Sequence, residues 1–270
     1  MTATPSVGWA APTPVAGKRL SGTVGRELVF ALAAIAPGIA PTTRHVTLHA
    51  PKPRPRPKPK SFVLSSQQHE LYRYAFVIRT GVARSAPRKT AAVVAGLARW
   101  TPEGTTNLVQ TLEGRRTRHG VWIKVRLPIL PANRTGWVKR KALSDWKEVR
   151  TRLLVDRRRL TATLYRRGKV AFRAPVGVGV SHWPTPRGEF FIRNQLYGFG
   201  NPVYGPIAFG TSARSPVLTD WPDGGFVGIH GTDRPELLPG RVSHGCIRMR
   251  NEDILELGRL MPVGTPVTIH

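Results

Sequence analysis

The sequence has a single cysteine, Cys246, among its 270 residues. One thiol excludes an intrachain disulfide, so cysteine usage does not indicate the redox compartment. A structural zinc site is disfavoured too, because such sites use four ligands and sulfur-rich ones pair their cysteines. A zinc site made of His230, His244 and Cys246 is the less favoured alternative. With no nucleotide-binding glycine loop and no catalytic pair of carboxylates recognisable, we expect neither a metal nor another cofactor.

Acidic residues are also few: 15 Asp and Glu face 42 Lys and Arg, which gives a formal net charge of +27. A field of this sign attracts polyanions. The basic residues are spread along the chain without a helix-turn-helix pattern, a zinc knuckle or an aromatic RNA-binding signature. We therefore predict no nucleic-acid partner and consider anionic cell-wall polymers as possible partners. No dedicated protein partner is predicted.

The N-terminal region has only a short apolar run. It consists of the nine residues 28–36 and follows Lys18 and Arg19. Nine residues are too few to span a bilayer and suit the apolar region of a signal peptide. Residues 51–60 alternate proline with a cation, a pattern that favours an extended spacer. We interpret residues 1–60 as an export signal or membrane-proximal segment followed by this linker. The protein is then extracytoplasmic, secreted or membrane-tethered; a short buried helix over residues 28–36 is the alternative.

The lone cysteine has the surroundings of a nucleophile. His230 and His244 precede Cys246, and Arg248 and Arg250 follow it. Cationic neighbours lower a cysteine pKa, and an adjacent base lets a thiol carry an acyl group. A turn-rich loop joins His230 to Cys246 and would let the two meet. The alternative is a cysteine that only packs as a small buried apolar residue. The cluster of histidines and arginines around Cys246 makes this alternative less favoured.

Glycine and proline together number 52, and the β-branched and aromatic runs are short, so a mainly β protein is predicted. Asn251 is expected to cap a short helix with an apolar face formed by Ile254, Leu255, Leu257 and Leu260. The candidate strands are residues 74–78, 91–94, 121–125, 152–156, 160–165, 170–176 and 265–269.

The end of the chain resembles the YkuD-like L,D-transpeptidase family of bacterial cell-wall enzymes. Three segments carry the resemblance: His230-Gly231-Thr232, then Ser243-His244-Gly245-Cys246-Ile247-Arg248-Met249, and upstream Pro184-Thr185-Pro186-Arg187-Gly188-Glu189-Phe190. It runs from about residue 152 to residue 270. The resemblance implies a β-sandwich-like catalytic domain over residues 150–270 with a short C-terminal helix.

The resemblance also implies an activity. Cys246 would attack a peptidoglycan stem tetrapeptide, release the terminal D-alanine and form a thioester, and a neighbouring stem amine would complete a 3→3 crosslink. Roles in cell-wall biogenesis and cell shape, and acylation by carbapenems, would follow. An L,D-carboxypeptidase of the same fold and a non-enzymatic basic wall-binding protein are the alternatives. A papain-like peptidase is disfavoured, because only the terminal His270 follows Cys246.

Each residue of the motif is assigned a role through the resemblance. His230 matches the general base, and Gly231, which follows it, can orient the imidazole only through its backbone carbonyl. The amides of Gly245 and Cys246 are candidate oxyanion donors. His244 is expected to support site geometry or the acceptor side, and is grouped with the catalytic residues.

Substrate contacts are expected on both sides of the motif. Arg248 suits a stem-peptide carboxylate, and Ser243 and Gly231 are grouped with it, although Ser243 reads as more structural than catalytic. Residues 194–223 are expected to form a long irregular lid that carries Tyr204 and Trp221.

A second, weaker resemblance lies upstream. Residues 121–125 and 136–138 are similar to the closing strands of bacterial Src-homology-3-type barrels. We predict such a small β-barrel domain over residues 70–146, with residues 144–150 as a polar joint. Trp122 and Trp137 are candidates for a ligand groove, with at least one of them expected in the core.

Overall fold

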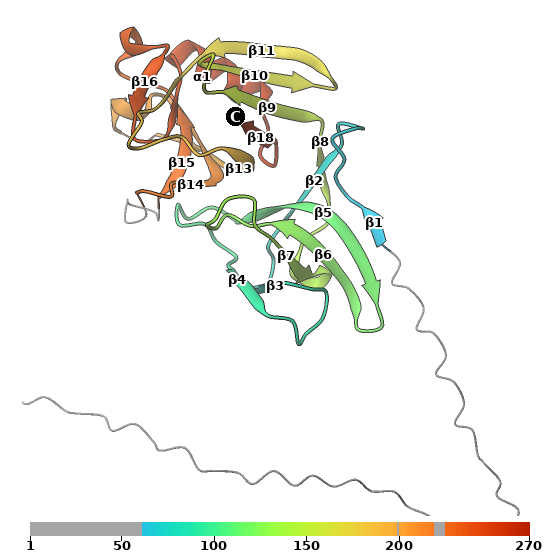
Figure 1. Cartoon of the computed structure of the whole chain (residues 1–270). Helices are drawn as coiled ribbons and strands as arrows, with labels where there is room; N and C mark the ends of the chain where they lie inside the picture. The colour runs from blue at the N-terminus through green and yellow to red at the C-terminus, as the bar shows by residue number, and fades with distance from the viewer. Residues whose placement is uncertain (1–60, 199, 219–224) are drawn as a thin grey trace, which may run out of the picture. The chain divides into compact units, whose positions relative to one another are not determined.

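A computed structural model describes residues 61–198, 200–218 and 225–270 (Figure 1). The predictions on residues 1–60 and on Trp221 lie outside these residues. The described chain is mainly β, with two sheets and one α-helix, as the sequence predicts. Among the helices of the described residues, none is long and apolar enough to cross a membrane.

The first sheet has eight strands in the order β4-β3-β7-β6-β5-β2-β8, with β1 paired to β5. All its named pairs are antiparallel. Its strands are β1 (Ser61–Val63), β2 (Tyr72–Phe76), β3 (Gly81–Arg84), β4 (Val93–Leu97), β5 (Leu108–Thr117), β6 (Gly120–Arg126), β7 (Thr135–Lys139) and β8 (Lys147–Val149).

The core of the first sheet follows from alternating apolar residues that point to one face. Ala75, Val77, Ile123 and Val138 are fully buried within it. Trp122 and Trp137 are both buried, at 2% and 7% exposure, so together they do not form an open groove. Cations cover their rings instead, with Lys139 Nζ 4.1 Å from the centroid of Trp122 and Arg115 Cζ 5.3 Å from that of Trp137.

Four strands of this region, β1, β3, β5 and β8, were not predicted from the sequence. Residues 144–150 are not only a polar joint, because β8 lies within them and pairs with β2. The ten-residue strand β5 has no counterpart among the predicted strands, yet it pairs with β1, β2 and β6. Its sequence mixes apolar residues with Gln110, Glu113 and Arg115, which hides the alternation that marks a strand.

The second sheet has ten strands in the order β11-β10-β9-β18-β13-β14-β15-β17-β12-β16. It is mixed, since β18 pairs with β9, β15 with β17 and β12 with β16 in parallel. Its strands are β9 (Thr151–Asp156), β10 (Thr161–Arg166), β11 (Lys169–Pro175), β12 (Gly177–Gly179), β13 (Gly188–Tyr197), β14 (Ile207–Arg214), β15 (Phe226–His230), β16 (Gly240–Ser243), β17 (Ile247–Arg248) and β18 (Pro266–Ile269).

Helix α1 (Asn251–Leu260) packs on the core of this second sheet through Ile254 and Leu257, both fully buried. The predicted cap is wrong in detail: Arg250 is the N-cap residue and makes no side-chain capping bond. Asn251 lies one position inside the helix, and its Oδ1 accepts a hydrogen bond from Thr232 N at 3.0 Å. The amide side chain therefore holds the chain that follows His230.

A third apolar cluster joins the two sheets. Phe191 of β13 is fully buried and belongs to a cluster with residues of the first sheet, namely Tyr72, Tyr74, Leu108 and Val149. Gly264, just before β18, faces the ring of Tyr74 so closely that a Cβ there would lie 2.2 Å from Tyr74 Cδ1. A side chain at 264 would thus displace the aromatic ring from the junction.

The segment 194–223, predicted as one long irregular lid, contains regular structure. Strand β13 continues to Tyr197, and β14 adds eight more strand residues that pair with β13 and β15. The alternation of β14, Ile-Ala-Phe-Gly-Thr-Ser-Ala-Arg, is masked by its small residues. Irregular chain remains at 200–206 around the short helix η2 (Pro202–Tyr204), and at 215–218.

Candidate active site

The lone cysteine lies in the short loop between β16 and β17. Ser243 ends β16, and its Oγ donates to the carbonyl of Cys246 while accepting from the amide of Gly245 at 3.1 Å. Gly245 has a φ of +116°, a conformation that disfavours any residue with a Cβ. The Ser-His-Gly-Cys order therefore forms a tight turn, tied internally by the serine hydroxyl, that places the thiol directly before β17.

Thr185, in the Thr-Pro segment, supports this turn from outside. Its Oγ1 donates to the carbonyl of Gly245 at 2.8 Å and accepts from the amide of Gly179 at 2.8 Å. Thr185 is 1% exposed, so both bonds are shielded from water. The carbonyl of Thr185 accepts in turn from Arg157 Nη1. Arg157, the residue after β9, thus anchors the Thr-Pro segment.

Parallel pairing of β15 with β17 brings the histidine to the cysteine. Ile229 pairs with Ile247 and His230 with Arg248, so Gly228 lies opposite Cys246. Residues two apart in a strand share a face, which puts Gly228 and His230 on one face of β15. A Cβ on Gly228 would lie 3.8 Å from His230 Cδ2 and 3.9 Å from Cys246 Sγ. The bare glycine leaves space between the imidazole and the thiol, and its amide donates to Cys246 Sγ at 3.4 Å.

The imidazole of His230 is buried, and its orientation is fixed from the Nδ1 side. Nδ1 lies 2.6 Å from the carbonyl oxygen of Gly231. A carbonyl only accepts, so Nδ1 carries the proton and Nε2 is the basic nitrogen. Tyr204 of η2 packs edge-on against the ring at 5.1 Å between centroids. The position after the histidine must be small, since a Cβ on Gly231 would lie 2.3 Å from Asn251 Oδ1.

Burial makes both members of the pair neutral. Burial is the main cause that lowers the pKa of His230 to about 4; the charge of Arg248 lowers it further and the Gly231 carbonyl opposes the shift. Burial likewise raises the pKa of the Cys246 thiol, against the Gly228 amide and the Arg248 charge, which both lower it. A neutral thiol beside a neutral imidazole favours proton transfer during attack over a resting thiolate–imidazolium pair.

Cys246 and His230 line one cavity of about 480 Å³. Five further predicted residues are brought to this site: Tyr204, Ser243, His244 and Arg248 line the cavity, and Gly231 adjoins it through His230. Arg248 is half-buried, whereas His244 is exposed and stacks on Trp183 at 4.1 Å between ring centroids. Within the described ranges, no group of three or more His, Cys, Asp or Glu side chains could hold a metal ion.

The predicted oxyanion donors need a correction. The amide of Gly245 donates to Ser243 Oγ, so it is engaged in the turn and does not serve as the expected donor in this conformation. The amide of Cys246 remains the candidate. Ser243, grouped with the substrate contacts, is 2% exposed and bonded on both sides of the turn, which makes its main contribution structural.

Sequence reasoning missed several residues that shape the site. Glu103 of the first sheet lines the cavity together with Phe226 and the backbone of Gly228. Arg193 of β13 pairs with Glu103 at 2% exposure. A buried arginine in a strand is unusual enough to suggest a partner, but the sequence does not say which of 15 carboxylates it meets.

Comparison with known proteins assigns the second half of the chain. The sequence profile of the YkuD family, described as the L,D-transpeptidase catalytic domain, matches residues 150–269. Two relatives named as the L,D-transpeptidase YkuD are each 37% identical to this chain. The Bacillus licheniformis protein aligns over 44% of this chain and 64% of its own length, and the Bacillus subtilis protein over 41% and 60%. The chain thus spans somewhat less than two thirds of these relatives.

Among solved structures, the catalytic domain of the Enterococcus faecium L,D-transpeptidase is similar to this chain. The two sequences are 29% identical. The aligned region covers 44% of this chain and 96% of the Enterococcus faecium domain, with a TM-score of 0.35.

Proposed function

We propose that the protein, whose residues 150–269 match the YkuD family of L,D-transpeptidase catalytic domains, forms 3→3 crosslinks between peptidoglycan stem peptides through a thioester on Cys246. The pairing of a buried imidazole with the lone thiol in one cavity is the observation that carries this proposal. Both side chains stand at positions that the family motif marks, and together they bring a nucleophile and a base to the cavity.

The first half-reaction is acylation. Nε2 of His230 takes the thiol proton as Cys246 Sγ attacks the amide carbonyl of the third stem residue. The amide of Cys246 donates to the developing oxyanion. The C–S bond forms, the C–N bond breaks, and the imidazolium returns its proton to the leaving amine of D-alanine. Since the pKa of free His230 lies at about 4, its protonated form is a strong enough acid for that step.

The second half-reaction transfers the acyl group. An amine of a neighbouring stem attacks the thioester, a C–N bond forms, the C–S bond breaks, and the thiol is restored. Water in place of the amine would give the carboxypeptidase. The apolar part of the lining, which includes Phe209 and Phe226, favours exclusion of water from the thioester. Arg248 is suited to a stem carboxylate, because its half-buried guanidinium lines the same cavity.

The proposed substrate sets the proposed location. Peptidoglycan lies outside the cytoplasm, so the enzyme would act in the wall or periplasmic space, secreted or membrane-tethered. The +27 charge would favour retention on anionic wall polymers. Neither retention nor export changes the chemistry at Cys246.

The experiment compares full-length wild type with Cys246→Ala by intact-protein mass spectrometry after incubation with a carbapenem. We expect one stoichiometric adduct on wild type and none on Cys246→Ala. The same pair is then given a disaccharide-tetrapeptide, and products are separated by mass into crosslinked dimer and tripeptide.

Each outcome has a distinct meaning. Dimer formation by wild type alone supports the transpeptidase. Tripeptide without dimer would replace it with the carboxypeptidase. A folded, reduced wild type that forms no adduct and no product would overturn acyl transfer and favour a wall-binding protein.

A further inference from the structure

The first sheet sends one loop into the cavity of the second. Residues 101–105, between β4 and β5, carry Glu103, which lines the same cavity as Cys246. The loop is held in shape by its own bonds. Thr101 N donates to Thr105 O at 2.8 Å, and the two threonine hydroxyls lie 2.8 Å apart. Gly104 N donates to Thr101 O at 3.0 Å, which closes a turn that points the carboxylate outward from its own sheet.

Glu103 is paired with residues of β13 through both carboxylate oxygens. Oε1 accepts from Arg193 Nη2, and Oε2 accepts from Asn194 Nδ2 at 3.2 Å. Asn194 Nδ2 also reaches Thr105 Oγ1 at 3.1 Å. Burial would raise the pKa of Glu103, but the charge of Arg193 and further hydrogen bonds lower it, so the carboxylate is ionised. The pair is buried, at 2% exposure for Arg193 and 15% for Glu103.

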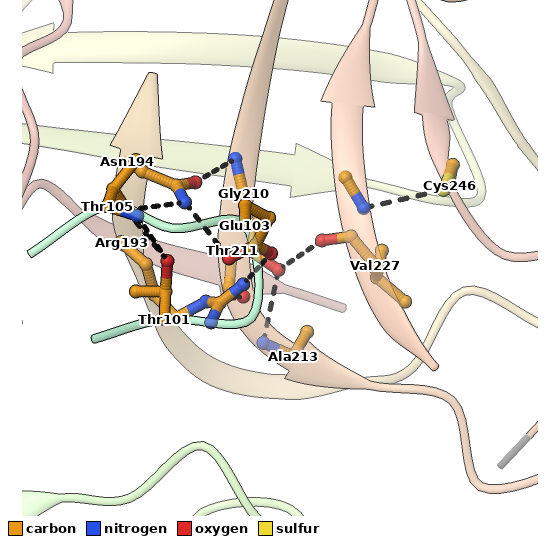
Figure 2. A network of polar contacts seen from close by, with 11 residues as sticks. Thr101, Glu103, Thr105, Arg193, Asn194, Gly210, Thr211, Ala213, Val227 and Cys246 are labelled. Carbon is orange, nitrogen blue, oxygen red and sulfur yellow. Dashed lines mark hydrogen bonds and ion pairs between the residues drawn. The ribbon is translucent and has the colours of Figure 1, made fainter. Parts of the chain in front are cut away.

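Arg193 connects Glu103 to the two strands next to the thiol, β14 and β15, through hydrogen bonds. Its Nε donates to the carbonyl of Thr211 in β14 at 2.9 Å. Thr211 Oγ1 donates to the carbonyl of Val227 in β15 at 2.6 Å and accepts from Ala213 N at 3.1 Å. The peptide unit after Val227 supplies the Gly228 amide that donates to Cys246 Sγ. Figure 2 shows this row running from Glu103 across Thr211 and Val227 to Cys246.

A second contact fixes the start of β15. The guanidinium of Arg193 lies over the ring of Phe226, with Cζ 3.6 Å from the ring centroid. Phe226 opens β15 and lines the cavity. The β14–β15 pairing has a register shift between Gly210 and Arg214, and Arg214 pairs with Phe226 beyond it. Arg214 Cζ also lies 4.9 Å from the Phe226 ring, so Arg193 adds a second cation to the support of this irregular part of the pairing.

We propose that Glu103 is a positioning residue for the nucleophile: by holding Arg193 against Thr211 and Phe226, it sets the position of the Gly228 amide at Cys246 Sγ. The first sheet then contributes to the chemistry of the site as well as to its shape. No substrate needs to be assumed, because the effect acts on the thiol of the free protein. The inference can therefore fail or hold independently of the proposed crosslinking.

The test measures the rate of Cys246 alkylation by iodoacetamide against pH in full-length wild type and Glu103→Gln. Glutamine keeps the shape of the side chain but replaces one carboxylate oxygen with an NH₂ group. This NH₂ is a donor, and it would face another donor, either Asn194 Nδ2 or the Arg193 guanidinium. The Gly228 amide lowers the pKa of the thiol, so a displaced amide must move the alkylation midpoint upward. We expect a rise of roughly half to one pH unit, and alkylation about threefold to tenfold slower at neutral pH.

The matched control is Glu113→Gln on β5. Glu113 pairs with Lys124 at 3.3 Å within the first sheet, and both side chains are about one third exposed. We expect it to leave the alkylation midpoint unchanged. An unshifted midpoint in folded Glu103→Gln would overturn the proposal, as would an equal shift in Glu113→Gln.

A second variant guards against misfolding, since Glu103→Gln leaves a buried arginine without its ion pair. The double variant Glu103→Leu with Arg193→Met replaces both charges by apolar side chains, a change that buried ion pairs often tolerate. It removes the Thr211 contact while keeping the packing. The same upward midpoint shift, at an unchanged melting temperature, is expected; a wild-type midpoint would contradict the proposal. Glu103→Asp, which keeps the charge, should recover part of the wild-type midpoint.

Discussion

The two sheets contribute to the site in opposite ways. The ten-stranded sheet supplies the thiol, the imidazole and the turn that presents them, within a short stretch of sequence and a small set of backbone bonds. The eight-stranded sheet supplies no reacting group. It offers one carboxylate at the end of a loop, about ninety positions away from its partners in the chain. The thiol and the imidazole are thus close together in the sequence, whereas the carboxylate that supports them is distant in the sequence.

This difference has a physical cause. Nucleophile and base must meet within hydrogen-bond reach, and adjacent parallel strands are an economical way to fix them. A support needs only to hold backbone in place, so any element that packs on the strands can provide it. The junction can serve this role, because Phe191 of the second sheet packs with residues of the first and Gly264 lies close against Tyr74.

The largest effect is expected at His230 and would sharpen the comparison, because it removes chemistry from one sheet only. His230→Gln should slow carbapenem acylation by about 10²–10⁴-fold, the usual contribution of a positioned base. The pKa of His230 is lowered to about 4, so the wild-type base is neutral above that value. Its acylation rate should therefore be nearly flat from about pH 5 to neutrality.

In His230→Gln the thiol must ionise by itself, and its pKa is raised by burial. The rate should then climb about tenfold per pH unit through neutrality. Stopped-flow acylation from pH 4 to 9 separates the two profiles. A flat profile in His230→Gln would show that another group takes the proton, and would remove His230 from the proposed mechanism.

The sequence was sufficient to predict that the histidine and the cysteine of the motif lie together. Strand β9 matches its predicted residues within one position, β6 extends one residue beyond them at each end, and the two motif residues Cys246 and His230 line one cavity. These features depend on residues close in sequence: alternation, turns and a contiguous motif. Even the carbonyl of Gly231 as partner of the imidazole follows from the lack of a side chain at 231.

The remainder depended on contacts that no local pattern records. Glu103 reads as a turn residue between Pro102 and Gly104, and nothing near it names Arg193. The Gly245 amide looked available until the serine hydroxyl was seen to bind it. Strand β14 was hidden because its pairing, and not its hydrophobicity, defines it.

The next largest effect tests whether the two sheets are one cooperative unit. Phe191→Ala should lower the free energy of unfolding by about 3–5 kcal/mol, as for other buried phenylalanines, because the cavity opens at the junction. Phe190 is the matched control: it is the neighbouring residue on β13, is 3% exposed, and faces the core of the ten-stranded sheet. Urea unfolding is followed by fluorescence and circular dichroism.

We expect Phe191→Ala to separate one transition into two, since it weakens the junction and leaves each core intact. In Phe190→Ala the unfolding transitions measured by fluorescence and by circular dichroism should still coincide, or only the second sheet should lose stability. Two transitions already in wild type would show that the sheets fold independently, and the junction would then be too weak to carry the Glu103 contact.

The smallest effect is expected at Thr185, the support that belongs to the ten-stranded sheet itself. Thr185→Val keeps the shape but removes the hydroxyl that bonds to Gly245 O and Gly179 N. An unsatisfied buried group costs about 1–3 kcal/mol, so the free energy of unfolding should fall by roughly that amount. Thr185→Ser keeps the hydroxyl and is the control.

The alkylation profile then distinguishes this support from the distant one. Thr185 holds the carbonyl side of the turn and does not contact the amide at the sulfur, so Thr185→Val should slow acylation while leaving the thiol midpoint near that of wild type. Glu103→Gln should move the midpoint with less loss of stability at the turn. If both variants shift the midpoint of Cys246 alkylation equally, the turn that carries Cys246 and strand β15 respond together. The distinction between near and distant support would then disappear, and the loop of the first sheet would act only by adding rigidity to the whole site.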